Sequence, residues 1–241
     1  MKPALKRITP YLAAAGICIV ATFAYAVSQH GKPAVITNRH TVASRVSDIL
    51  NKKPHLKDEA QRANGPLTLV ILKQERQVEA YAPGWDEPKR FAMTGFSGKL
   101  GPKLREGDLQ IPEGIYGIAL LNPNSHYYLS MKVSYPNGFD RAEAKKEGRT
   151  DLGGDIMIHG KSATIGCIPI GDDAIEDLFY LVNATGWKKT TVIIAPYDMR
   201  SGRDKALEGK VQIGWYPILC DRIEMELKGI GKAKSQASQP L

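Results

Sequence analysis

The sequence predicts a mainly β domain of the α+β class. Between residues 66 and 197, short apolar or alternating runs follow one another, separated by turn residues, as in a protein built from many short strands. Helical periodicity is confined to a few segments beside these runs. A chain of 241 residues with 43% hydrophobic and 24% charged residues has the composition of a globular protein, and its length suits one sizeable domain with appendages.

The first 26 residues predict a signal peptide or an N-terminal anchor. Basic residues precede an apolar run over residues 11–27, and Ala24, Tyr25 and Ala26 give the small-x-small pattern of a cleavage site. The run is shorter than the span of about 20 residues that a membrane helix needs, which favours cleavage over anchoring. We therefore expect export, with contact to a membrane only if this segment stays uncleaved.

The charge pattern bears on the class of binding partner, and the cysteine content bears on whether the protein has a disulfide. The net charge is +8, but lysines and arginines alternate with acidic residues and form no basic, aromatic stripe, which argues against nucleic acid as a partner. Cys18 lies in the predicted export segment, so the exported part keeps Cys167 and Cys220. A disulfide between them is one interpretation. The glycine-rich context of Cys167 favours the other, a thiol kept free for reaction.

Residues 27–65 predict a polar linker that contains one short helix, from Thr41 to Lys52, and the catalytic domain is expected over 66–197. Its first two strands should form a hairpin. The expected strands are Leu67–Lys73, Gln77–Ala82, Phe91–Gly95, Ile115–Leu121, Tyr127–Val133, Asp155–Ile158 and Thr191–Ala195.

The segments between and after these strands predict loops and two further helices. Gly98 to Gly114 is dense in breakers and charges and reads as a loop, and residues 141–150 read as a charged surface excursion. A helix should begin with a capping box of Asp173 and Glu176 and end at Gly186. The segment 198–241 predicts an appendage with a helix from Pro217 that ends at Gly229, followed by a disordered tail from Lys232.

The run from Asp155 to Ile170 places a histidine and a cysteine in and after one short strand. His159 ends the apolar run, and Cys167 follows a loop of small polar residues. A thiol needs a base within reach to become a strong nucleophile, and Gly166 beside it allows a substrate carbonyl to approach the backbone closely. The pattern predicts cysteine nucleophilic catalysis.

These residues resemble the signature of the YkuD-type L,D-transpeptidases, a His-Gly pair followed by a Ser/Thr-x-Gly-Cys element. His159-Gly160 and Thr164-Ile165-Gly166-Cys167 match it, and the loop with Gly101-Pro102-Lys103, Glu106-Gly107-Asp108 and Pro112-Glu113-Gly114 is similar to a loop of that family. The resemblance implies a sandwich-like or barrel-like β domain that performs acyl transfer on peptidoglycan stem peptides, in the periplasm of a Gram-negative bacterium, with no cofactor.

Carried onto this chain, the resemblance implies that Cys167 is the nucleophile and His159 the proton acceptor, oriented by the backbone carbonyl of Gly160. The N–H groups of Gly166 and Cys167 are the expected donors to an oxyanion. Pairing with the histidine is expected to give a thiolate near neutral pH, because such pairing lowers a thiol pKa. An acyl-enzyme thioester would then pass to an amine or to water.

Three departures leave the substrate open. Most members of the family have a longer segment between the histidine and the cysteine, an arginine where this chain has Pro169 and a histidine where it has Ile165. The YafK-like branch shares all three departures and is associated with hydrolytic release of peptidoglycan-linked lipoprotein. Crosslinking of stem peptides, release of a wall-attached lipoprotein and a non-catalytic wall-binding module therefore remain as alternatives.

Four further residues are candidates for contacting substrate: His126, Lys161, Ser162 and Thr164. A zinc site of His126, His159, Cys167 and Asp155 is conceivable, but the chain has no closely spaced ligand pair, and no metal is expected.

Overall fold

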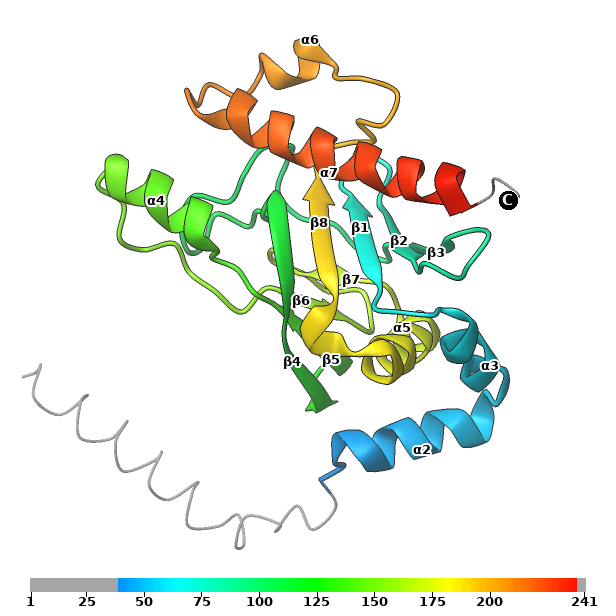
Figure 1. The fold of residues 1–241 in the computed structure, drawn as a ribbon. Helices are drawn as coiled ribbons and strands as arrows, with labels where there is room; N and C mark the ends of the chain where they lie inside the picture. Colours follow the sequence, from blue (N-terminus) through cyan, green and yellow to red (C-terminus); the bar gives the residue numbers. More distant parts are fainter. Residues whose placement is uncertain (1–38, 238–241) are drawn as a thin grey trace, which may run out of the picture. The chain divides into compact units, whose positions relative to one another are not determined.

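An eight-stranded sheet organises the part of the chain that the computed structural model describes, residues 39–237 (Figure 1). The strand order is β3-β2-β1-β8-β4-β5-β6-β7; β1 pairs in parallel with β8 and β6 with β7, and the other pairs are antiparallel. The strands are β1 Thr68–Leu72, β2 Gln77–Tyr81, β3 Lys89–Ala92, β4 Gly114–Ser125, β5 Tyr128–Val133, β6 Met157–His159, β7 Ile168–Pro169 and β8 Thr191–Ala195. The mainly β, α+β class is confirmed. The predicted export segment, 1–26, lies outside the described residues.

The two faces of β1 pack into different cores, as strand alternation requires. Leu69 and Ile71 belong to the larger core, which includes the apolar face of α5 (Asp172–Thr185). Val70 and Leu72 belong to a second core against α7 (Tyr216–Ala237). Figure 1 shows these two helices on opposite sides of the strands. Because both faces are covered, β1 and β8 read as continuous apolar runs rather than alternating ones.

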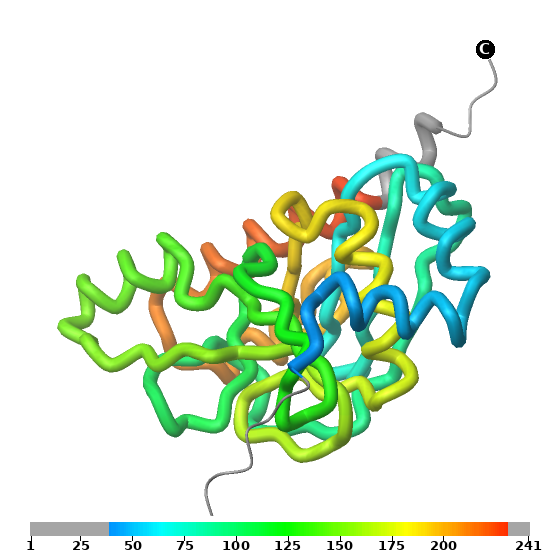
Figure 2. Tube along the Cα trace, turned by 90° about the horizontal axis from the view of Figure 1, so that it is seen from below, coloured from blue at the N-terminus to red at the C-terminus, as the bar shows by residue number. Residues whose placement is uncertain are grey.

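Two helices, where one was predicted, precede the sheet. In α2 (Val42–Lys52), Thr41 is the N-cap and accepts a hydrogen bond from the Ser44 N–H at 3.0 Å. A second helix, α3 (His55–Arg62), follows. Their residues Ile49 and Leu56 are fully buried in the larger core. Figure 2 shows α2 running beside α5 towards the β4–β5 hairpin, and Asn124 of that hairpin exchanges hydrogen bonds with the backbone of His40.

The loop between Gly98 and Gly114 is built on a buried ion pair. Lys73 Nζ lies 2.7 Å from Glu113 Oε1, both side chains are inaccessible to solvent, and Lys73 also donates to the carbonyls of Gly101 and Ile111. Tyr216 of α7 donates to the other oxygen of Glu113 at 2.8 Å. Every polar atom of the pair is therefore satisfied, which is the condition for burying charge.

The capping box predicted for α5 was wrong. The N-cap of α5 is Gly171, with no side-chain cap, and Glu176 bonds instead to Tyr128 and Lys52; Gly186 does end this helix, in a left-handed conformation. The charged excursion contains a helix, α4 (Gly138–Lys146), begun by a capping box of Asn137 and Asp140.

The last helix, α7, passes Gly229 and runs to Ala237, into the segment predicted as a disordered tail. A glycine inside a helix costs only about 1 kcal/mol relative to alanine, and the lysines, alanines and glutamine that follow favour a helix. A short helix, α6 (Lys205–Glu208), precedes it in the predicted appendage. Among the described residues, no helix is long and apolar enough to cross a membrane.

Candidate active site

Strand register brings His159 and Cys167 to one face of the sheet. In the parallel pair β6–β7, Ile158 lies beside Ile168 and His159 beside Pro169, so Cys167 stands level with Met157. Alternate residues of a strand share a face, which turns His159 and Cys167 to one side and the two fully buried isoleucines to the other. With strands about 4.8 Å apart and about 3.3 Å per residue, the Cα atoms of His159 and Cys167 lie roughly 8 Å apart.

Both side chains line one cavity of about 610 Å³. Its walls come from four parts of the chain: the loop before β4, the β4–β5 hairpin, the β6 region and the loop that carries Cys167. The lining residues are Lys103, Glu106, Gly107, Leu109, Asn122, Asn124, Ser125, His126, Tyr127, Ser130, Gly153, Gly154, Asp155, Ile156, Met157, His159, Ala163, Thr164, Ile165, Gly166 and Cys167. A volume of this size suits a peptide or another small ligand.

The imidazole of His159 is held in one orientation. Its Nδ1 lies 2.5 Å from the carbonyl oxygen of Gly160, and because a carbonyl only accepts, Nδ1 carries the proton. The ring of Tyr127 covers it at 4.6 Å between centroids. Burial lowers the pKa of His159, so the ring is neutral at neutral pH and its Nε2 is a proton acceptor.

Burial of Cys167 acts against the thiolate that the sequence analysis expects. Burial raises the pKa of Cys167, although a backbone N–H at Met157 and the charge of Lys103 act in the opposite direction. The Sγ atom lies 3.5 Å from the carbonyl oxygen of Asp155, to which the thiol donates. The charge of Lys103 offsets only part of the effect of burial, and the neighbouring imidazole is neutral and adds no positive charge. Thiol and imidazole thus rest as a neutral pair.

Thr164 holds the turn that presents Cys167. Its hydroxyl accepts from the N–H of Cys167 at 2.8 Å and of Gly166 at 3.2 Å, and it donates to the carbonyl of Cys167 at 2.8 Å. The two expected oxyanion donors therefore already have an acceptor in this structure. Gly166 has φ +126°, and a Cβ there would meet the carbonyl oxygen of Gln110 at 3.0 Å, so this position requires glycine.

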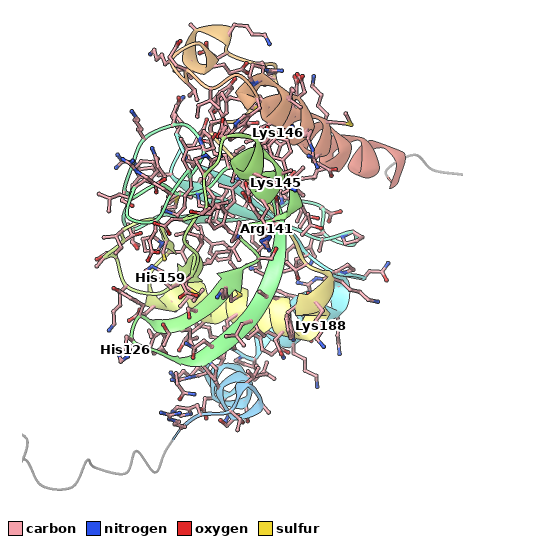
Figure 3. The ribbon with its side chains drawn as sticks, turned by 90° about the vertical axis from the view of Figure 1, so that its left-hand side faces the viewer. His126, Arg141, Lys145, Lys146, His159 and Lys188 are labelled. Atoms are coloured by element: carbon pink, nitrogen blue, oxygen red, sulfur yellow. The ribbon has the colours of Figure 1, made fainter. Side chains whose placement is uncertain are left out.

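The other candidates divide into two groups. His126 and Thr164 line the cavity, whereas Lys161 and Ser162 do not. Lys161 binds the outside of the site: its Nζ donates to the carbonyl of His126 at 2.6 Å and its N–H to Asp172 Oδ1 at 2.8 Å. Figure 3 shows His126 at the end of the β4–β5 hairpin, on the same side of the molecule as His159. Lys161 thus ties the Cys167 loop to the hairpin and to the start of α5.

The cavity residues that the sequence analysis did not name as candidates include Asn122, Tyr127 and Ser130. The ring of Tyr127 packs against the imidazole of His159. Asn122 and Ser130 lie on the neighbouring strands β4 and β5, in register with His159. The only sequence signal is that polar side chains at 128, 130 and 132 alternate with apolar ones.

The structure also bears on the disulfide and the zinc site considered in the sequence analysis. Cys167 and Cys220 are both free. Among residues 39–237, no group of three or more histidine, cysteine, aspartate or glutamate side chains is placed to hold a metal ion.

Comparison with known proteins gives one family. The model of the YkuD L,D-transpeptidase catalytic domain matches residues 66–194. YafK of Escherichia coli (strain K12), a protein named after the L,D-transpeptidases, is 32% identical over 161 residues, and the match spans 63% of this chain and 63% of that relative.

Two solved structures are also similar. The helical cell shape determining protein Pgp2 from Campylobacter jejuni is 23% identical, with a TM-score of 0.41 over 62% of this chain and 57% of its own. Bd1075 of Bdellovibrio bacteriovorus is 16% identical, with a TM-score of 0.39 over 70% and 57%.

Proposed function

The chain belongs to the YkuD family of L,D-transpeptidase catalytic domains, and on this premise we propose that it is an exported enzyme that transfers or hydrolyses acyl groups of peptidoglycan stem peptides through Cys167. One observation carries the proposal. A partly exposed thiol and a neutral imidazole with a free Nε2 lie on one face of the sheet and line the same cavity. A wall-binding module needs neither group.

The first half of the reaction would form a thioester. As Cys167 Sγ attacks the carbonyl carbon of the donor peptide, its proton moves to Nε2 of His159. The tetrahedral intermediate then expels an amine, which takes that proton from the imidazolium. The hydrogen bond from Nδ1 to the carbonyl of Gly160 stabilises the transient positive charge on the ring.

The second half would return the enzyme to its resting state. His159 removes a proton from an amine or from water as either one attacks the thioester, and Cys167 leaves and takes the proton back. Attack by an amine gives a crosslink, and attack by water gives cleavage. Because the pair rests neutral, proton transfer accompanies each attack and does not precede it.

A second candidate function is hydrolysis that releases a wall-attached lipoprotein. Pro169, in place of the arginine found in most of the family, favours it, since the YafK-like branch shares this departure. Pro169 is buried on β7 beside His159, so this position offers no cation to a substrate carboxylate. The basis for export is the predicted signal in residues 1–26.

The test is to incubate the purified protein with muropeptides and, separately, with lipoprotein-linked muropeptides, and to weigh the products. Dimeric crosslinks indicate transfer, and shortened peptides or released lipoprotein indicate hydrolysis. A Cys167→Ala variant, which lacks only the thiol, should give neither. Products formed equally by this variant would contradict the proposal.

A further inference from the structure

A row of polar side chains crosses three neighbouring strands at the level of the histidine. Asn122 of β4 pairs with Ser130 of β5, and Ser130 pairs with His159 of β6. Residues directly opposite each other share a face of the sheet, and all three line the cavity. Strands lie about 4.8 Å apart, so the row extends roughly 10 Å from His159 to Asn122.

Ser130 carries a hydroxyl that faces the cavity and has no partner within the described part of the chain. Its residue is 2% exposed, and among the described residues no donor or acceptor bonds to its side chain. The Gly160 N–H donates to the Leu129 carbonyl, which makes Ser130 and His159 a non-hydrogen-bonded pair, the kind in which side chains come closest. Because the side chain lines the cavity, a group bound there can form a hydrogen bond with this hydroxyl.

Asn122 extends the row with an amide that is fixed at one end. Its Oδ1 accepts from the N–H of Asn124 at 2.9 Å, which leaves the two N–H donors of the side chain for another group. A hydroxyl and an amide in line offer both donors and acceptors without net charge. These groups match a peptide backbone, which presents alternating N–H and C=O groups.

The row lies on the far side of His159 from Cys167, since β7 is the other neighbour of β6. In the proposed reaction, His159 gives a proton to the leaving amine and later takes one from the attacking group. Both must therefore bind beside the imidazole. We propose that Ser130 and Asn122 form the subsite that binds the peptide backbone of the leaving and accepting chain, an inference that rests on the proposed function.

Two substrates with the same acyl part test this subsite. One releases a single amino acid and the other a peptide of three or more residues. An extended chain covers about 3.3 Å per residue, so only the longer leaving group reaches Asn122. We expect Asn122→Ala to lower kcat/KM three- to tenfold for the longer substrate, the effect of about one hydrogen bond, and to leave the shorter one within about twofold.

Matched variants separate binding from folding. Asn122→Asp keeps the oxygen that accepts from Asn124 and removes both donors, and it should show the same selective loss. Ser130→Ala should lower kcat/KM for both substrates, because Ser130 is next to His159, and Ser130→Thr should restore much of it. Ser201→Ala, in an exposed turn outside the cavity, should change neither.

The possible outcomes separate failure of the proposed subsite from failure of the proposed acyl transfer through Cys167. Unchanged kinetics, or an equal loss on both substrates in the Asn122 variants, would overturn the subsite while thioester formation on Cys167 continued. A wild-type protein that forms no thioester with either substrate would contradict the proposed function, and the subsite with it.

Discussion

Cys167 and Cys220 are both free thiols, but the two regions that hold them prepare them for opposite roles. Cys167 stands partly exposed at the wall of a cavity, in a turn bonded by Thr164. Cys220 is fully buried in α7, and burial raises its pKa to about 12. The comparison shows that position in the fold, more than the pKa of either thiol, decides which cysteine can meet a substrate, because burial raises the pKa of both.

The largest expected effect is on alkylation. At pH 8, iodoacetamide should modify Cys167 about 1,000-fold faster than Cys220 or more, because Cys220 reacts only when the helix opens and then only as the rarer thiolate. Peptide mass spectrometry of samples quenched over time gives both rates in one experiment. Similar rates at the two positions would remove the distinction on which the assignment of Cys167 rests.

Removal of the imidazole of His159 should affect the reactivity of Cys167 but not that of Cys220. His159→Ala should lower turnover about 100- to 10,000-fold, the usual contribution of a general base, because no group then accepts the thiol proton. Cys220 alkylation and the free energy of unfolding serve as controls and should change little. A variant that retains near wild-type turnover would exclude His159 as the proton acceptor.

The region around Cys220 should become less stable when the buried ion pair between Lys73 and Glu113 is broken. Lys73→Met should lower the free energy of unfolding by about 3–5 kcal/mol, because the carboxylate of Glu113 stays buried without its cation. Cys220 alkylation should accelerate, since Tyr216 of α7 bonds to Glu113. Denaturant unfolding measures the first effect. The double variant Lys73→Met/Glu113→Leu should recover part of the stability, and failure to recover any would argue that shape rather than charge is limiting.

The turn that presents Cys167 should depend on one hydroxyl. Thr164→Val keeps the shape of the side chain but loses three hydrogen bonds to the backbone, and we expect kcat/KM to fall about 10- to 100-fold. Thr164→Ser should retain most activity. Equal activity of the valine and serine variants would mean that the hydroxyl is not needed to hold the turn.

The smallest expected effect concerns pH. The imidazole must be neutral to accept a proton, and its pKa is lowered from 6.5, so activity should be lost only as pH falls below about 6.5. Tyr127→Ala uncovers the ring and should move this acid limb of kcat/KM to higher pH by less than about one unit. A shift to lower pH would contradict the shielding role of Tyr127.

The sequence predicted what depends on local pattern. Alternation located the strands on both sides of the active site, and the His-Gly and Thr-x-Gly-Cys elements predicted that His159 and Cys167 act as a pair. It did not predict β7, because two residues are too few to show a period. It also read Lys73 as the polar end of a strand, whereas its partner Glu113 lies 40 residues away in sequence.

The row of Asn122 and Ser130 at the active site also could not be predicted from local sequence pattern. Each residue is an ordinary polar position in its own strand, and only the register of three strands places them in line with His159. Likewise, the sequence motif suggested a thiolate, but the burial that keeps Cys167 protonated comes from segments far apart in the chain. Long-range pairing, not composition, sets these properties.

The most direct test of the account is the intact mass of the protein shortly after mixing with a stem-peptide substrate. We predict a mass increase equal to the acyl part of the donor, located on Cys167 by peptide mapping and absent from Cys167→Ala, while Cys220→Ala acquires it normally. Turnover of the substrate by Cys167→Ala, or an acyl group found on any other residue, would contradict it.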